Sequence, residues 1–160
     1  MNTLKNANRL YHSSDYQTYL KKIAAHEVER EFCRHNLAHF LDVARIVTIK
    51  CLENHMNLSR DLIYTTALLH DIGRFEQYEK QIPHEVASHQ LAIPLLAELD
   101  FDAVEKSLIL TAILNHRNSQ SRGFDKIFYE SDKLSRNCLV CPAQTKCDWS
   151  DAKKNMTLHY

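Results

Sequence analysis

The sequence predicts an all-α fold in a single domain, and three observations support this prediction. Only two glycines and three prolines occur among 160 residues, far below their usual share, so few residues are available for turns. Apolar side chains recur at helical spacing through most of the chain. The length fits one domain with a full core and is too short for two comfortable ones. We therefore expect one helical bundle over residues 1–160 with short connections.

Three helical stretches are expected in the first half of the chain. The first, residues 15–31, carries its apolar side chains on one side: Tyr16, Tyr19, Leu20 and Ile23. The second, residues 36–55, has a longer stripe, which comprises Leu37, Phe40, Leu41, Ala44, Val47 and Cys51. The third, residues 59–72, begins with Ser59 as a candidate N-cap and has Asp61 in its first turn.

Three more helical stretches are expected in the second half. They cover residues 85–99, 102–115 and 124–137. Pro94 should kink or break the first of these helices, because proline has no amide hydrogen to donate. Residues 74–84 and 117–123 are expected to be loops, and the tail from Cys138 onward to be irregular.

Charge and hydropathy exclude several classes of protein. The formal net charge is zero and the isoelectric point is about 7.1, so the chain lacks the basic field that non-specific nucleic-acid binding requires. No stretch approaches 18 consecutive apolar residues, and residues 1–10 lack the apolar region of a secretion signal. We expect a cytoplasmic protein that does not bind membranes; the composition leaves the oligomeric state open. Ten histidines in 160 residues favour a metal site.

The most informative motif is the run His70-Asp71-Ile72-Gly73-Arg74, where a helical apolar stretch ends. Gly73 is expected to be a left-handed cap just beyond the last turn. Asp71 would then lie near the negative end of the helix dipole, which disfavours a carboxylate by roughly 0.3–1 kcal/mol unless a cation is nearby. A lone His-Asp pair is usually only a polar helix end. Here His39 precedes it and Asp132 follows it, and such ligands suit iron, manganese, cobalt, nickel or zinc.

The order and surroundings of these residues resemble a known superfamily. The runs His39-Phe-Leu-Asp-Val-Ala, Leu-Leu-His70-Asp71-Ile-Gly-Arg and Ser-Asp132-Lys133 are similar to those of the HD-domain metal-dependent phosphohydrolases. The resemblance covers about residues 32–136. It implies a helical bundle in which one divalent metal is held by four residues, His39, His70, Asp71 and Asp132.

The resemblance also implies a second metal, because the superfamily has a branch in which the doublet's aspartate bridges two ions. His84 and His116 match the two further histidines of that branch, and His89 competes with His84 for the same role. His35 lies one turn before His39 on the same face, so it is expected to stand behind the ligands.

The activity implied by the resemblance is hydrolysis of a small, nucleotide-like phosphomonoester or phosphodiester by a metal-activated water, with Asp71 as the bridging group. Arg74, Arg117 and Lys133 are each either phosphate ligands or solvated surface charges. Three alternatives remain: a mixed-valent di-iron oxygenase with much the same six ligands, a non-catalytic nucleotide-binding module on the same scaffold, and a purely structural helical domain. The sequence does not name the substrate.

A second cluster, Cys138, Cys141 and Cys147, has the spacing C-x2-C-x5-C within residues 138–149. In a chain without a secretion signal, close cysteines favour metal over disulfides. The fourth ligand would be Cys33 or Cys51. Cys33 lies six residues before His39, and Cys138 lies six residues after Asp132. If the helices carrying His39 and Asp132 run antiparallel, both cysteines lie about 9 Å from the metal in the same direction, by helical rise. This favours Cys33 as the fourth ligand.

Four thiolates would hold zinc or an iron–sulfur cluster, and the alternative is a set of buried thiols without metal. The spacing is similar to the iron–sulfur closures of some DNA-processing enzymes. The pairing of Phe32-Cys33-Arg34-His35 with Ser135-Arg136-Asn137-Cys138 also resembles a bacterial subgroup of small HD proteins.

Overall fold

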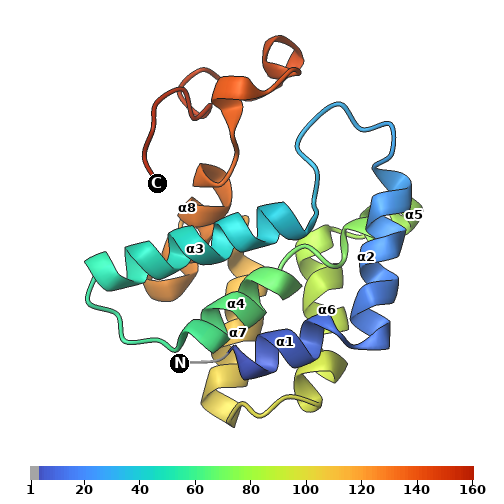
Figure 1. Cartoon of the computed structure of the whole chain (residues 1–160), viewed down its shortest axis with the longest axis vertical. Coiled ribbons are helices and arrows are strands. Elements are labelled where there is room, and N and C mark those ends of the chain that lie inside the picture. The colour runs from blue at the N-terminus through green and yellow to red at the C-terminus, as the bar shows by residue number, and fades with distance from the viewer. Residues whose placement is uncertain (1–3) are drawn as a thin grey trace.

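The computed structural model describes residues 4–160, and the regular elements of this range are all helical (Figure 1). The α-helices are α1 (Lys5–Tyr11), α2 (Ser14–His26), α3 (Leu37–Glu53), α4 (Arg60–Leu69), α5 (Arg74–Lys80), α6 (His84–Ala97), α7 (Ala103–Asn115) and α8 (Gly123–Leu134). Two short 3-10 helices follow, η1 (Cys138–Val140) and η2 (Gln144–Lys146). The predicted all-α fold is confirmed.

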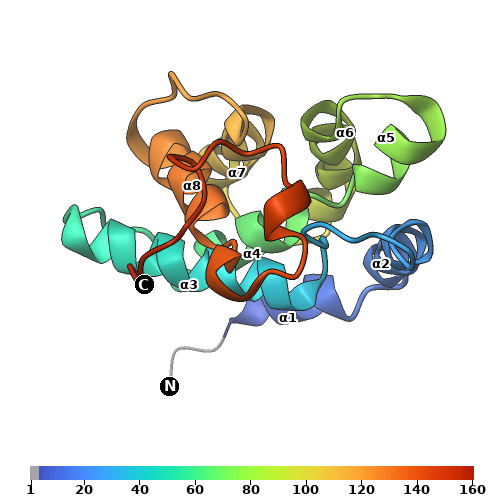
Figure 2. The same ribbon diagram turned by 90° about the horizontal axis from the view of Figure 1, so that it is seen from above.

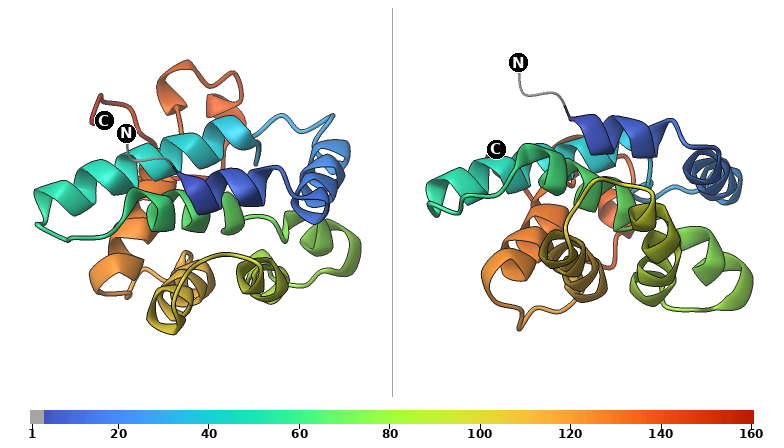
Figure 3. Two further views of the ribbon diagram at one scale, coloured as in Figure 1. Left: turned by 60° about the horizontal axis from the view of Figure 1, so that its bottom comes forward. Right: turned by 90° about the horizontal axis from the view of Figure 1, so that it is seen from below.

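Helix α4 occupies the centre of the bundle, with α1, α3, α6 and α7 packed around it (Figures 2 and 3). Nearly every side chain from Leu62 to Leu69 is buried. A helix that is apolar on all sides belongs in a core, which explains this position. Helix α8 packs on α3, and α5 packs on α6 and α2. The His-Asp doublet therefore lies where the central helix ends, inside the protein.

Several element boundaries differ from the prediction. Helix α1 was not expected, and α2 ends at His26, five residues early. The expected loop 74–84 contains α5, a helix too short for its periodicity to be recognised; Phe75 is its one buried residue. Helix α6 continues through Pro94. Pro94 has no amide hydrogen, so the Gln90 carbonyl lacks its helical hydrogen bond. Both residues are exposed, and water can therefore bond to that carbonyl.

Gly73 is not the left-handed cap that the sequence predicts. Its φ is −82°, and it is the N-cap of α5. The need for glycine comes instead from packing, because a Cβ atom here would lie 2.3 Å from the Ser88 backbone nitrogen and 2.6 Å from the Ala87 Cβ. The Gly73 amide also donates to the Ser88 hydroxyl at 2.9 Å. This close approach of two backbones brings the doublet against the start of α6.

No helix within residues 4–160 combines the length and the hydropathy needed to cross a membrane.

Candidate metal centre

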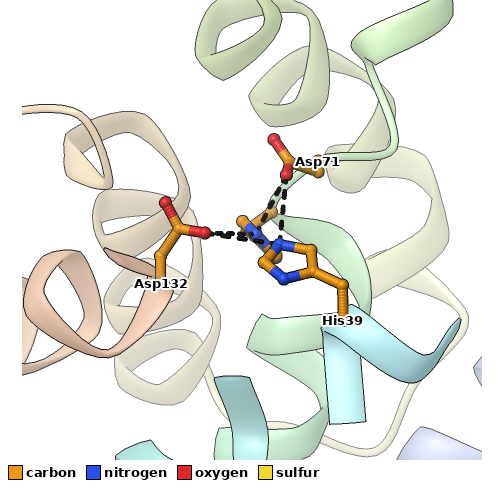
Figure 4. A group of neighbouring side chains, drawn as sticks. His39, Asp71 and Asp132 are labelled. Atoms are coloured by element: carbon orange, nitrogen blue, oxygen red, sulfur yellow. Dashed lines mark ion pairs between the residues drawn. The ribbon is translucent and has the colours of Figure 1, made fainter. Parts of the chain in front are cut away.

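Four buried side chains meet at the end of the central helix: His39 from α3, His70 and Asp71 from the end of α4, and Asp132 from α8. His39 Nε2 lies 3.3 Å from Asp132 Oδ1 and 3.6 Å from Asp71 Oδ2 (Figure 4). His70 Nε2 lies 3.2 Å from Asp71 Oδ2 and 3.6 Å from Asp132 Oδ1. Two imidazole nitrogens and two carboxylate oxygens therefore face one point.

A second group forms on the other side of the Asp71 carboxylate. Asp71 Oδ1 lies 3.2 Å from His84 Nε2 and 3.6 Å from His116 Nε2. His84 is the first residue of α6, and His116 caps the C-terminus of α7. Thus one oxygen of Asp71 faces the first pair of histidines and the other oxygen faces the second pair. The structure brings His84 to this position and leaves His89, partly exposed on α6, outside both groups.

The outer nitrogen of each ring is held so that Nε2 points inward. The Nδ1 atoms of His70 and His116 lie 2.7 and 2.6 Å from the carbonyl oxygens of Ala67 and Ile113. The other two rings use side chains: His39 Nδ1 lies 3.1 Å from the Ser135 hydroxyl, and His84 Nδ1 lies 2.7 Å from Gln77 Oε1 and 2.8 Å from Arg74 Nη1. For His39, His70 and His116, an Nδ1 that donates to oxygen leaves the Nε2 lone pair of the neutral ring free, as metal-binding histidines require.

Four of the inward-facing atoms lack hydrogen-bond partners although they are buried. These unpaired atoms include His39 Nε2, His70 Nε2, Asp71 Oδ1 and Asp132 Oδ1. Buried polar groups are normally satisfied, and the candidate ligand atoms of each group lie within 4.8 Å of one another. The residues thus fit divalent cations, which would satisfy all four atoms at once.

Electrostatics supports the same interpretation. Burial raises the pKa of Asp71, but His70 and His35 outweigh it and hold that pKa well below its usual range. Burial lowers the pKa of His70, yet the adjacent carboxylates raise it to about 9. For His84, burial and then nearby Arg74 outweigh Asp71 and lower the pKa to about 2, so its ring is a neutral ligand. With this pKa, His70 would carry a proton on Nε2 in the metal-free site, and a bound cation would replace that proton.

Comparison with known proteins agrees with this geometry. The HD domain family matches residues 36–143 of this chain. The chain belongs to the HD domain family. It is 41% identical to an uncharacterised protein of Clostridium beijerinckii (strain ATCC 51743 / NCIMB 8052) over 153 residues, 96% of this chain and 98% of that protein. HD domains bind divalent metals, and the buried histidine–aspartate cluster provides a place for them here.

The fold is shared with a solved structure. The crystal structure of a predicted HD superfamily hydrolase from an uncultured Thermotogales bacterium superposes with a TM-score of 0.65 over 91% of this chain and 82% of that protein. The two sequences are 17% identical, so this likeness concerns the fold alone.

Behind the first metal group of the HD domain lies a polar relay whose outer members sequence reasoning missed. The buried His35 ring lies with Nε2 3.8 Å from Asp71 Oδ2, while its Nδ1 hydrogen-bonds to Glu27. Glu27 also accepts from the Tyr78 hydroxyl at 2.7 Å. Burial raises the pKa of Glu27, but the bonds from His35 and Tyr78 lower it to about 2. Glu27 reaches this position because α2 ends at His26, just before it. No local sequence motif predicts that helix end.

The HD centre opens into a cleft of about 400 Å³ that has a basic lining. The predicted Arg74, Arg117 and Lys133 all line it. Arg74 donates to Gln77 at 3.0 Å, Arg117 Nη1 lies 3.6 Å from Glu85, and Lys133 donates to the outer oxygen of Asp132. Sequence reasoning did not identify the further cations of the lining, which are Arg30, Arg136 and Lys154, or its aromatic side chains, Phe32 and Trp149.

The cysteines divide into one group and one separate residue. Cys33, Cys138, Cys141 and Cys147 all line the cleft of the HD centre. Cys51 is buried in the hydrophobic core on α3, as its apolar stripe predicts. Both Cys33 and Cys138 lie outside the α-helices, so the helical rise used to relate them does not apply, although they do lie at one cleft.

Proposed function

We propose that this protein is a metal-dependent phosphohydrolase that cleaves a small phosphomonoester or phosphodiester with two divalent ions. The observation that carries this proposal is the placement of the Asp71 carboxylate between two pairs of histidine nitrogens. Its Oδ2 faces His39 and His70, and its Oδ1 faces His84 and His116. This arrangement suits one aspartate shared by two cations, with Asp132 completing the first group.

The chemistry follows from the donors. Divalent ions in such a site lower the pKa of bound water and neutralise phosphate oxygens, and iron, manganese, cobalt, nickel and zinc all suit nitrogen and carboxylate ligands. The protein holds the donors in place, because every inward nitrogen belongs to a ring whose other nitrogen has a fixed partner. Lys133 neutralises the outer oxygen of Asp132, which keeps that carboxylate ionised.

The cleft supports a nucleotide-like substrate. Arg74, Arg117 and Lys133 offer cationic donors beside the metal groups, where the phosphate of an ester would lie. Phe32 and Trp149 line the same cleft and offer aromatic surface on which a base can stack. The volume of about 400 Å³ is in the range of small-molecule sites.

The test is a substrate panel with matched variants. Anaerobically purified protein would be loaded separately with each of the five metals and assayed for phosphate release from nucleotides and simple phosphate esters. Metal content would be measured on the same samples. We expect metal-dependent hydrolysis and two ions per chain at the histidine and aspartate ligands, and we expect His84→Ala to lower the number at these ligands to one.

His89→Ala is the matched control, because this second histidine of α6 lies outside both ligand groups. It should keep both ions and full activity. No hydrolysis under any metal would overturn the proposal. Turnover that consumes dioxygen would identify an oxygenase on the same ligands, and nucleotide binding without turnover would identify a regulatory module.

A further inference from the structure

The segment that carries three cysteines is tied to the segment that carries the fourth. Arg136 donates to the Arg34 carbonyl at 3.2 Å, and Lys146 pairs with Glu31 at 2.8 Å. Arg30 donates to the carbonyl of Cys33 itself at 2.8 Å. Residues 30–34, which connect α2 to α3, are therefore held against the chain that follows α8.

Local backbone geometry brings the three C-terminal cysteines to one side. Successive turns connect residues three apart, through bonds from the Cys141 amide to the Cys138 carbonyl at 3.3 Å, from Gln144 to Cys141 at 3.2 Å, and from Cys147 to Gln144 at 3.4 Å. Within the two 3-10 helices, Cys138–Val140 and Gln144–Lys146, residues three apart eclipse one another, and Cys141 between them is extended. Cys138, Cys141, Gln144 and Cys147 accordingly all line the cleft.

The other three thiols act electrostatically on Cys33. The pKa of Cys33 is raised, chiefly by burial and further by its neighbours Cys141, Cys138 and Cys147, while Arg136 lowers it. None of the five cysteines forms a disulfide, and Cys51 lies apart on α3 in the hydrophobic core. Four of the five thiols therefore line one cleft, and the fifth, Cys51, lies in the hydrophobic core.

The cysteine sulfurs of the described chain do not form a preformed tetrahedral zinc site. A zinc ion with bonds of about 2.3 Å holds its four sulfurs about 3.8 Å apart. Among residues 4–160, cysteine sulfurs do not form a set of three within 4.8 Å of one another, whereas the histidine and aspartate ligands of the HD centre do form such sets. In a [4Fe–4S] cluster each iron takes one thiolate and inorganic sulfides bridge the irons, so the four cysteine sulfurs lie farther apart than around one zinc ion. The neighbouring Arg30, Lys133 and Arg136 would balance its negative charge.

We propose that Cys33, Cys138, Cys141 and Cys147 bind an iron–sulfur cluster in the wall of the cleft. The cluster ties the C-terminal segment to the α2–α3 connection. The proposal is independent of the hydrolase proposal, because it concerns other residues and predicts a different cofactor.

The experiment measures iron, acid-labile sulfide and zinc in the full-length protein, purified anaerobically and also reconstituted with iron and sulfide. Sulfide separates this site from iron at the histidines. We expect sulfide together with the broad visible absorption of a cluster. Single cysteine-to-alanine substitutions at the four positions should reduce sulfide to background, with helix content by circular dichroism unchanged. Cys51→Ala is the matched control and should keep the sulfide.

A second comparison separates the two sites. The double variant His39→Ala/Asp132→Ala should lose metal from the HD centre and retain its sulfide. Stoichiometric zinc bound through the four cysteines, without sulfide after reconstitution, would overturn the cluster. So would an equal loss of sulfide in the Cys51→Ala protein.

Discussion

The HD centre and the four-cysteine wall share one cleft, but the protein supports them differently. The histidines and aspartates of the HD centre are buried and come from helices or helix ends packed around α4. Of the four cysteines only Cys138 is buried, and all four lie on connections or 3-10 turns outside the α-helices. The first set is held by a hydrophobic core, whereas the second depends on a few surface contacts and on the ligand that it would bind. One cleft therefore combines a centre held by core packing with a wall that has few contacts of its own.

The largest expected effect comes from the residue shared by both halves of the HD centre. Asp71→Asn should lower hydrolysis by about a thousandfold, because the loss of several kcal/mol of metal-mediated stabilisation affects both ions. Metal content and phosphate release measured together would check this. Asp42→Asn, at an exposed position on α3, is the control and should be neutral. An active Asp71→Asn protein with both ions bound would show that Asp71 is not the bridge.

The rigidity of the HD centre can be tested at Gly73. Gly73→Ala should lower the free energy of unfolding by about 3 kcal/mol, because the new methyl group would meet backbone atoms of α6 that cannot move aside cheaply. Gly123→Ala, in open space with a φ of +57°, should cost about 1 kcal/mol. Urea denaturation of both variants would check the difference. Equal losses would indicate that the doublet does not rest on close packing between these segments.

The relay behind the centre should have an intermediate effect. His35→Gln should lower hydrolysis roughly 10- to 100-fold, as is usual for partners that orient metal ligands. Glu27→Gln should act in the same direction by a smaller factor, because it would remove the charge that fixes the His35 ring. The readout is kcat together with metal affinity. Full activity in both variants would make the relay a purely structural network.

The smallest effect is expected in the cysteine wall. Cys141→Ala should make the chain after α8 several-fold more sensitive to proteolysis, while the helical core stays protected, because the irregular segment has few contacts of its own. Limited proteolysis followed by mass spectrometry would locate the cuts. If cuts appeared equally within α3, α4 and α8, the two regions would not differ in how they are held.

Much of the centre was predictable because it depends on local signals. The helical period identified α3, α4, α7 and α8, and the order of His39, the doublet and Asp132 indicated ligands on separate helices. Glu27 and Tyr78 were not predictable, because Glu27 meets His35, and Tyr78 meets Glu27, only when the fold brings their segments together. Pro94 misled the prediction, since its effect on α6 depends on whether the freed carbonyl faces water.

The sequence by itself determined the helical class of the fold and the ligand types that an HD centre needs, because both follow from residue chemistry and short-range spacing. Only the tertiary structure decided that His84 rather than His89 meets Asp71, and that Cys33 rather than Cys51 joins the C-terminal cysteines. It also decided why position 73 must be glycine. These choices depend on how close two distant segments come, and that distance is fixed by packing around α4 rather than by any local pattern.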